Sequence, residues 1–161
     1  MDAFRETALK IQLICNKYNV PLIINDNVTL AKEIDADGVH VGQSDLEAAR
    51  VREILGPDKI IGVTAKTVEQ AVAAEAAGAD YLGSGAVFGT TTKLDAKKMS
   101  IDLLKEITSS VNIPVVAIGG IDETNIEQLK GTGIAGVAVV SGIFAKDDCK
   151  KAAKELKAVR L

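Results

Sequence analysis

A strand, a helix and a second strand are predicted in that order by residues 60–85, IIGVTAKTVEQAVAAEAAGADYLGSG. Residues 60–64 form a continuous, largely β-branched apolar run, which is typical of a strand buried on both faces of a parallel sheet. Apolar residues then recur at helical spacing from Val68 onward, and Thr67 followed by Gln70 has the pattern of a capping box. A further apolar run begins at Tyr81. This strand–helix–strand unit favours a parallel α/β sheet.

Similar apolar runs recur along the chain and alternate with segments of helical periodicity. The predicted strands occupy residues 21–24, 38–41, 60–64, 81–87, 114–118 and 136–140. A weak repeat at residues 35–42, 77–83 and 133–139 supports them, since each copy combines a helix end, a glycine-assisted turn and the start of a strand. We therefore predict an α/β fold, a TIM-type (β/α)8 barrel of which about six βα units are present, as a single partial barrel domain over residues 1–161.

The number of predicted strands leaves the closure of the barrel open. A (β/α)8 barrel has eight βα units and about 250 residues, whereas this chain has 161 residues. Either the six strands form an open α/β sheet, or two βα units are missing. The connection between the fourth and fifth predicted strands is the longest, and a long polar loop after a barrel strand favours a role in the active site.

Composition narrows the class of protein. The chain is 47% hydrophobic and 25% charged, which is typical of an ordinary globular protein. Its net charge of −3 argues against nucleic acid as a partner, because binding a phosphate backbone needs a basic surface. We see no apolar run of about 18 residues that could cross a membrane. The cysteines, Cys15 and Cys149, fit buried thiols in a reducing compartment, so we expect a cytoplasmic enzyme.

Two aspartates follow predicted strands. Asp26 comes directly after the run at residues 21–24, and Asp45 comes shortly after the run at residues 38–41. Ligands of α/β sheets collect at the carboxyl ends of strands, and Mg²⁺ takes one or two protein carboxylates together with water and substrate phosphates. The two aspartates therefore suit Mg²⁺. The alternative is that both are helix N-caps, and the two roles are compatible.

Three later segments suit a phosphate group. Residues 90–93, Thr-Thr-Thr-Lys, place three hydroxyls and one ammonium after the fourth strand, unless the loop is simply solvated. The paired glycines in residues 115–121 allow the backbone to approach a ligand closely, although turn glycines look the same. Residues 140–144 follow the last strand, where TIM barrels commonly bind phosphate.

The single histidine, His40, lies inside an apolar run. We interpret it as a polar residue held within the barrel rather than as a general base. Without a second histidine or a neighbouring cysteine, the sequence indicates neither a zinc site nor a nucleophile–base pair. We expect chemistry that depends on electrostatics and positioning rather than on a covalent intermediate.

Six motifs taken together resemble the thiamine-phosphate synthase family, in order and over essentially the whole chain. They are ND (25–26), VHVGQSD (39–45), IGVTA (61–65), DYLGSG (80–85), TTTK (90–93) and VAIGGI (116–121). The resemblance implies a barrel enzyme that joins hydroxymethylpyrimidine diphosphate to thiazole phosphate, giving thiamine phosphate and pyrophosphate. It also implies small phosphorylated molecules as partners and Mg²⁺ as cofactor.

The resemblance assigns roles to residues by position. Asp26 and Asp45 would bind Mg²⁺, and Asn25 and Lys93 would contact the pyrimidine diphosphate. Thr64 stands near the same diphosphate, where the family usually has serine, and Lys93 and Thr64 are the catalytic candidates. Mg²⁺ and Lys93 would neutralise charge that develops on the leaving diphosphate. The thiazole phosphate would be held by Thr90, Thr91, Thr92, Gly120, Val140 and Ser141.

The chain also departs from the family pattern. The family's barrel has two further βα units before the helix at which this chain starts, and the second of them carries a Gln-x-Arg-x-Lys motif for the pyrimidine diphosphate. A misplaced start, a truncation and one half of a split enzyme are all open. We expect that a homo-oligomer or a partner chain could supply the missing strands.

Two other functions stay open beside the synthase. A thiazole tautomerase-like isomerase is a related barrel, but it uses a histidine where this chain has Lys66. A non-catalytic phosphate-binding remnant would account for the missing strands.

Overall fold

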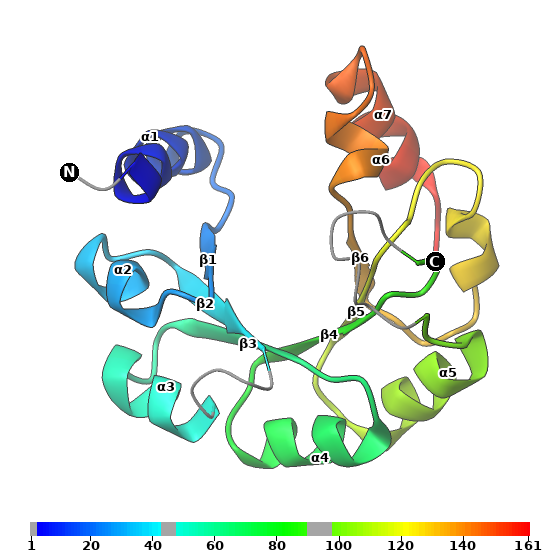
Figure 1. Ribbon diagram of the computed structural model, residues 1–161, viewed down its shortest axis with the longest axis horizontal. Helices are drawn as coiled ribbons and strands as arrows, with labels where there is room; N and C mark the ends of the chain where they lie inside the picture. Colours follow the sequence, from blue (N-terminus) through cyan, green and yellow to red (C-terminus); the bar gives the residue numbers. More distant parts are fainter. Residues whose placement is uncertain (1–2, 43–47, 90–97) are drawn as a thin grey trace. The chain divides into compact units, whose positions relative to one another are not determined.

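The computed structural model describes residues 3–42, 48–89 and 98–161 (Figure 1). The chain divides into two compact units. Unit 1 comprises Met1–Thr64 and Ala76–Asp80, and unit 2 comprises Ala65–Glu75 and Tyr81–Leu161. The single domain that we predict for residues 1–161 stays a prediction. Within the described part of the chain, no helix is long and apolar enough to cross a membrane.

Unit 1 is built on three parallel strands in chain order, each followed by or preceded by a helix. Its elements are α1 (Ala3–Lys17), β1 (Ile23–Asn25), α2 (Val28–Glu33), β2 (Gly38–Val41), α3 (Ala48–Leu55) and β3 (Ile60–Thr64). Alternate side chains of a strand point to opposite faces of its sheet. Val39, Val41 and Ile61 are fully buried on the face that α2 and α3 cover. The opposite face carries the polar side chains described below.

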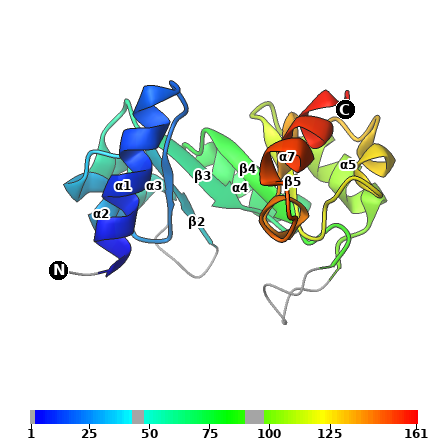
Figure 2. The ribbon, with the colours of Figure 1, turned by 90° about the horizontal axis from the view of Figure 1, so that it is seen from above.

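Unit 2 repeats this arrangement with its own three parallel strands. Its elements are α4 (Val68–Ala76, its last residue assigned to unit 1), β4 (Tyr81–Gly85), α5 (Ile101–Ser110), β5 (Val115–Ile118), η1 (Ile126–Leu129), β6 (Gly136–Ala138), α6 (Ser141–Phe144) and α7 (Cys149–Ala158). Leu82 of β4 is the Cα partner of Val115 of β5, and both are buried together with Leu104 and Ile107 of α5. Helices α6 and α7 pack against each other (Figure 2).

All six predicted strands are present in the described residues, and they differ from the prediction mainly at their ends. β1 begins at Ile23 rather than at Pro21. Proline has no N–H to donate, and the Leu22 N–H donates to the Asp37 carboxylate at 2.7 Å instead of extending the strand. β4 ends at Gly85, before the predicted end at residue 87, because the Ala86 carbonyl accepts from the Met99 N–H at 2.7 Å instead of from a neighbouring strand. Six parallel strands that alternate with helices thus confirm the α/β part of the fold prediction.

The predicted capping box opens α4 with one difference. The Gln70 N–H donates to the Thr67 hydroxyl at 3.2 Å, as an N-cap requires. The Gln70 side chain reaches back to the N–H of Lys66 at 2.8 Å, one residue before the cap.

The expectation of buried thiols was wrong in degree, since Cys15 and Cys149 are free but only partly buried.

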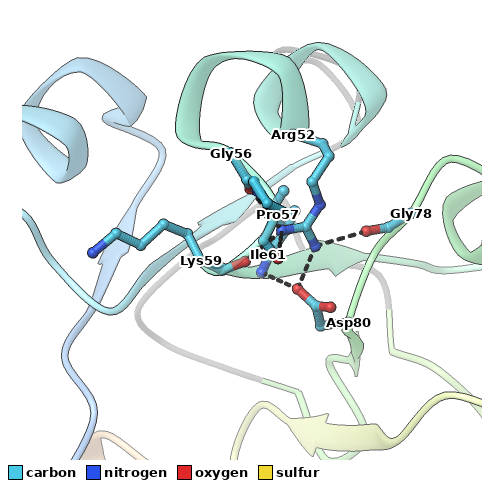
Figure 3. Close-up of polar contacts among 7 residues, drawn as sticks. All are labelled: Arg52, Gly56, Pro57, Lys59, Ile61, Gly78 and Asp80. Carbon is cyan, nitrogen blue, oxygen red and sulfur yellow. Dashed lines mark hydrogen bonds and ion pairs between the residues drawn. The ribbon is translucent and has the colours of Figure 1, made fainter.

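A guanidinium clamp fixes the start of β3 in unit 1 (Figure 3). Arg52 of α3 donates to four carbonyl oxygens and to the Asp80 carboxylate. The same carboxylate oxygen of Asp80 accepts from the Ile61 N–H at 2.7 Å. Arginine suits this position because its planar head offers five N–H donors in several directions. The clamp connects the end of α3 to the beginning of the strand that carries Thr64.

Candidate functional site

In unit 1, three predicted polar residues lie on one face of the sheet. Asn25 is the Cα partner of His40 in the β1–β2 pair, and His40 is the partner of Gly62 in the β2–β3 pair. Thr64 follows Gly62 by two residues, so its side chain points to the same face. His40 Nε2 lies 3.0 Å from Thr64 Oγ1. The structure therefore brings Asn25, His40 and Thr64 together, and His40 supports Thr64 through a hydrogen bond.

Asp26 follows β1 directly and is exposed. Its backbone has a left-handed φ of 62°, and its N–H donates to the His40 carbonyl at 2.8 Å. The N-cap of α2 is the next residue, Asn27, whose side-chain oxygen accepts from the Leu30 N–H at 2.9 Å. The N-cap alternative is thus wrong for Asp26. Its carboxylate stays at the exposed carboxyl end of β1, where a ligand of the sheet would bind.

Of the two aspartates predicted to bind Mg²⁺, the structure describes Asp26 alone. Asp45 lies outside the described residues, so its distance from Asp26 is not part of the structure. Among residues 3–42, 48–89 and 98–161, no three His, Cys, Asp or Glu side chains gather into a metal-binding group. The exposed carboxylate of Asp26, with a second from Asp45 outside the described residues, is a donor set that suits Mg²⁺, which binds through one or two carboxylates and substrate phosphates.

In unit 2, the loop after β5 packs against the loop after β4 through backbone atoms. Gly119 and Gly120 both have left-handed φ values, 102° and 68°. A Cβ atom at Gly119 would lie 2.5 Å from the Ala86 Cβ, and one at Gly120 would lie 2.3 Å from the Gly89 carbonyl oxygen. The Phe88 N–H also donates to the Gly119 carbonyl at 3.0 Å. Glycine is therefore required at both positions by conformation and by space.

The segment after β6 reaches the same loop. Val140 is 54% exposed and Ser141, the first residue of α6, is exposed as well. A Cβ atom at Gly142 would lie 2.4 Å from the carbonyl oxygen of Ile121. The structure thus places Ser141 beside the loop that contains Gly120, and phosphate binding by these residues stays a prediction. The sequence analysis did not single out Gly142, whose lack of a Cβ atom allows this close approach.

Four of the predicted phosphate contacts cannot be located. Thr90, Thr91, Thr92 and Lys93 lie outside the described residues. The loop that leads to them is described as far as Gly89, whose carbonyl lies against Gly120. Their roles stay predictions.

Charged side chains form hydrogen bonds within and beside the loop after β5 in unit 2. The Thr124 hydroxyl, 2.6 Å from Asp122 Oδ1, is the main cause that lowers the pKa of the Asp122 carboxyl. Lys146, which follows α6, donates to the Glu123 carboxylate at 2.6 Å. That hydrogen bond raises the pKa of Lys146 and lowers the pKa of Glu123. Asp122, Glu123 and Lys146 therefore connect the loop after β5 to the segment after α6.

The fold and these side chains define a class of protein, a parallel α/β protein whose polar candidate residues follow the carboxyl ends of its strands. A family model described as thiamine monophosphate synthase matches residues 1–143. The chain belongs to the thiamine monophosphate synthase family. This confirms the family that the sequence motifs resemble.

Individual relatives agree with the family model. The chain is 56% identical over 153 residues to a thiamine-phosphate synthase of Clostridium tetani, covering 95% of this chain and 73% of the relative. It is equally similar to a thiamine-phosphate synthase of Ruminiclostridium cellulolyticum, with the same coverage. A solved structure of thiamine phosphate pyrophosphorylase from Pyrococcus furiosus is 38% identical, with a TM-score of 0.87 over 95% of this chain and 73% of that one.

Proposed function

We propose that this chain transfers the hydroxymethylpyrimidine group from its diphosphate to thiazole phosphate, giving thiamine phosphate and pyrophosphate. The observation that carries the proposal is the 56% identity to relatives named thiamine-phosphate synthase over 95% of the chain. The two described groups of site residues give it chemical support, because each suits one of the two phosphorylated substrates. The same relatives favour the synthase over the tautomerase alternative.

The residues of unit 1 suit the pyrimidine diphosphate. Asn25 can donate its side-chain N–H groups to a diphosphate oxygen, and Thr64 can donate its hydroxyl while His40 orients it. Lys93, which lies outside the described residues, would add a positive charge, as the resemblance implies. Donors of this kind stabilise negative charge that develops on a departing diphosphate.

The residues of unit 2 suit the thiazole phosphate. Gly120 lets the backbone approach a phosphate closely, and the Ser141 hydroxyl is exposed beside the same loop. Thr90, Thr91 and Thr92 would add three hydroxyl donors, and Val140 is exposed directly before Ser141. Hydroxyl and backbone N–H groups hold an anion without carrying a charge of their own.

Asp26 and Asp45 are the residues that would hold Mg²⁺. The exposed carboxylate of Asp26, which does not cap α2, fits this role. When bound, Mg²⁺ supplies positive charge to the diphosphate leaving group. In the reaction, the C–O bond between the pyrimidine methylene and the diphosphate breaks, and a C–N bond forms to the thiazole nitrogen. The electron pair of the broken bond leaves with pyrophosphate, so no oxidant or reductant is needed.

A complete TIM-type barrel is the architecture that we propose for the functional enzyme. Four large apolar side chains of α1 in unit 1, Phe4, Ile11, Leu13 and Ile14, are 44–73% exposed, and Phe144 of α6 in unit 2 is 74% exposed. Several exposed large apolar side chains on one helix mark a surface that packs against another element or partner. We propose that additional βα elements or a second copy cover them in the cytoplasmic enzyme. Light scattering checks this, because a monomer that binds no apolar dye would contradict it.

The decisive experiment measures pyrophosphate release from the purified chain with both substrates, with and without Mg²⁺. We expect release only when all three are present. Asp26→Asn should lower the Mg²⁺-dependent rate by about 10–100-fold or more, because loss of even an outer-shell partner of a metal ligand costs about 10–100-fold. Asp58→Asn, at an exposed aspartate before β3, is the matched control and should keep the full rate. Equal rates for both variants would contradict the metal assignment, and no release from the unmodified chain would contradict the function.

A further inference from the structure

One side chain in unit 2, Asn125, forms hydrogen bonds to two backbone groups of the loop after β5. Its Nδ2 donates to the Gly120 carbonyl at 2.8 Å. Its Oδ1 accepts from the Asp122 N–H at 3.0 Å. The side chain is partly buried, and it lies just before η1, whose core side chains Ile126 and Leu129 are buried. Asn125 therefore sits on an anchored element and holds a short, glycine-containing segment.

The two hydrogen bonds require an amide of this length. The Gly120 carbonyl needs a donor and the Asp122 N–H needs an acceptor, and asparagine presents one of each. The Asp122 carboxylate does not compete for these groups, because it accepts from the N–H and the hydroxyl of Thr124 at 2.8 and 2.6 Å. The orientation of the Asn125 amide follows from its two partners.

Fixing the Gly120 carbonyl fixes the direction of a whole peptide group. The peptide bond is planar, so a carbonyl and the N–H that follows it point in opposite directions. The Gly119–Gly120 peptide is already held, because the Gly119 carbonyl accepts from the Phe88 N–H at 3.0 Å. The next peptide, from Gly120 to Ile121, follows a glycine with a left-handed φ, and glycine itself sets few steric barriers to its rotation. A rotated peptide would turn a carbonyl oxygen toward an anion where an N–H is needed. A side-chain clamp prevents that rotation.

We propose that Asn125 is a positioning residue for phosphate binding at the Gly119–Gly120 loop. The proposal rests on the proposed function, in that Gly120 is taken to face the phosphate of the thiazole substrate. Asn125 does not touch the ligand; it holds the backbone of Gly120 and Asp122 in the orientation that an incoming phosphate monoester meets. Its loss should weaken binding of that substrate and leave binding of the pyrimidine diphosphate unchanged.

The test compares Asn125→Leu with the unmodified chain. Leucine is close in size and adds no charge that would repel phosphate, but it makes neither hydrogen bond. Asn112→Leu, at an exposed asparagine before β5, is the matched control. Calorimetry measures the dissociation constant of thiazole phosphate alone, and steady-state assays measure KM for each substrate. We expect an increase of about tenfold or more in the dissociation constant and in KM for thiazole phosphate, with KM for the pyrimidine diphosphate within twofold.

Circular dichroism shows whether Asn125→Leu has folded. If it has not, Asn125→Ser, which is too short to bridge both groups, replaces it with the same expectation. Titration of the unmodified, ¹⁵N-labelled chain with inorganic phosphate needs no variant, and the amide signals of residues 119–122 should shift. Folded variants that bind thiazole phosphate as tightly as the unmodified chain, or amides that do not shift, would overturn the proposal. Binding without pyrophosphate release would refute the proposed function while leaving the role of Asn125 intact.

Discussion

Replacing Arg52 with methionine should destabilise the chain because the guanidinium clamp of Figure 3 would be lost. Arg52 donates to five groups, and its shortest hydrogen bonds, to the Lys59 carbonyl and to Asp80 Oδ2, are both 2.6 Å. Methionine keeps most of the apolar stem of arginine, so the change mainly removes polar contacts.

The magnitude follows from the exposure of the partners. A hydrogen bond that involves a charged group contributes about 1.5–3 kcal/mol when it is sheltered from water. The Arg52 side chain is only 24% exposed, but the Asp80 side chain is 46% exposed, so the ion pair itself contributes less than about 1 kcal/mol. The released carbonyls at the surface can bind water again. We therefore expect the free energy of unfolding to fall by about 2–3 kcal/mol, a large part of the roughly 5–15 kcal/mol of a typical domain.

Urea denaturation followed by circular dichroism measures this loss. Arg50→Met is the matched control on the same helix, because among the described residues Arg50 pairs with Glu53 alone, in an exposed i,i+3 ion pair. That variant should change the free energy of unfolding by no more than about 0.5 kcal/mol. Equal losses in the two variants, or an Arg52→Met loss below about 1 kcal/mol, would refute the argument that the clamp stabilises the start of β3.

Two further predictions concern the loop after β5. Gly120→Ala should destabilise unit 2 by about 1–3 kcal/mol, because the new Cβ would lie 2.3 Å from the Gly89 carbonyl oxygen and a left-handed φ of 68° is unfavourable for alanine. It should also weaken binding of thiazole phosphate. Thermal unfolding and calorimetry check the two effects, and an unchanged melting temperature would contradict the first. Asp122→Asn should lower stability more at neutral pH than in acid. The folded pKa of Asp122 lies below the usual 3.8, mainly because its carboxylate accepts from the Thr124 hydroxyl. The carboxylate therefore stabilises the fold above pH 3.8, and this contribution is lost as the pH falls through the folded pKa. Unfolding curves at pH 7 and pH 3 should therefore differ more between the two proteins at pH 7, and a constant difference would show that the carboxylate charge is not responsible.

Local patterns predict the elements of this fold well. The strands at residues 38–41 and 60–64 occur with the predicted bounds, because valine- and isoleucine-containing runs favour the extended conformation of a buried strand. The ends of β1 and β4 were less predictable. They depend on hydrogen bonds to Asp37 and Met99, which are distant in sequence.

The candidate site could be predicted only in part. The motifs that include Asn25, Asp26 and Gly120 indicate the correct ends of strands, and the family is confirmed by relatives along 95% of the chain. The sequence did not show that Asn27 rather than Asp26 caps α2, since both residue types are good N-caps. The choice depends on the backbone angle of Asp26, which its hydrogen bond to β2 maintains.

What the sequence determined by itself is the alternation of strands and helices, the glycines after β5 and the family, because periodicity and short motifs are local properties of the chain. Tertiary structure decided which polar groups meet. His40 and Thr64 are 24 residues apart and touch only because the register of β2 and β3 sets them on one face. The Asn125 clamp likewise exists only once the loop has turned back on η1, since hydrogen bonds that need a specific direction form after the backbone has its final path.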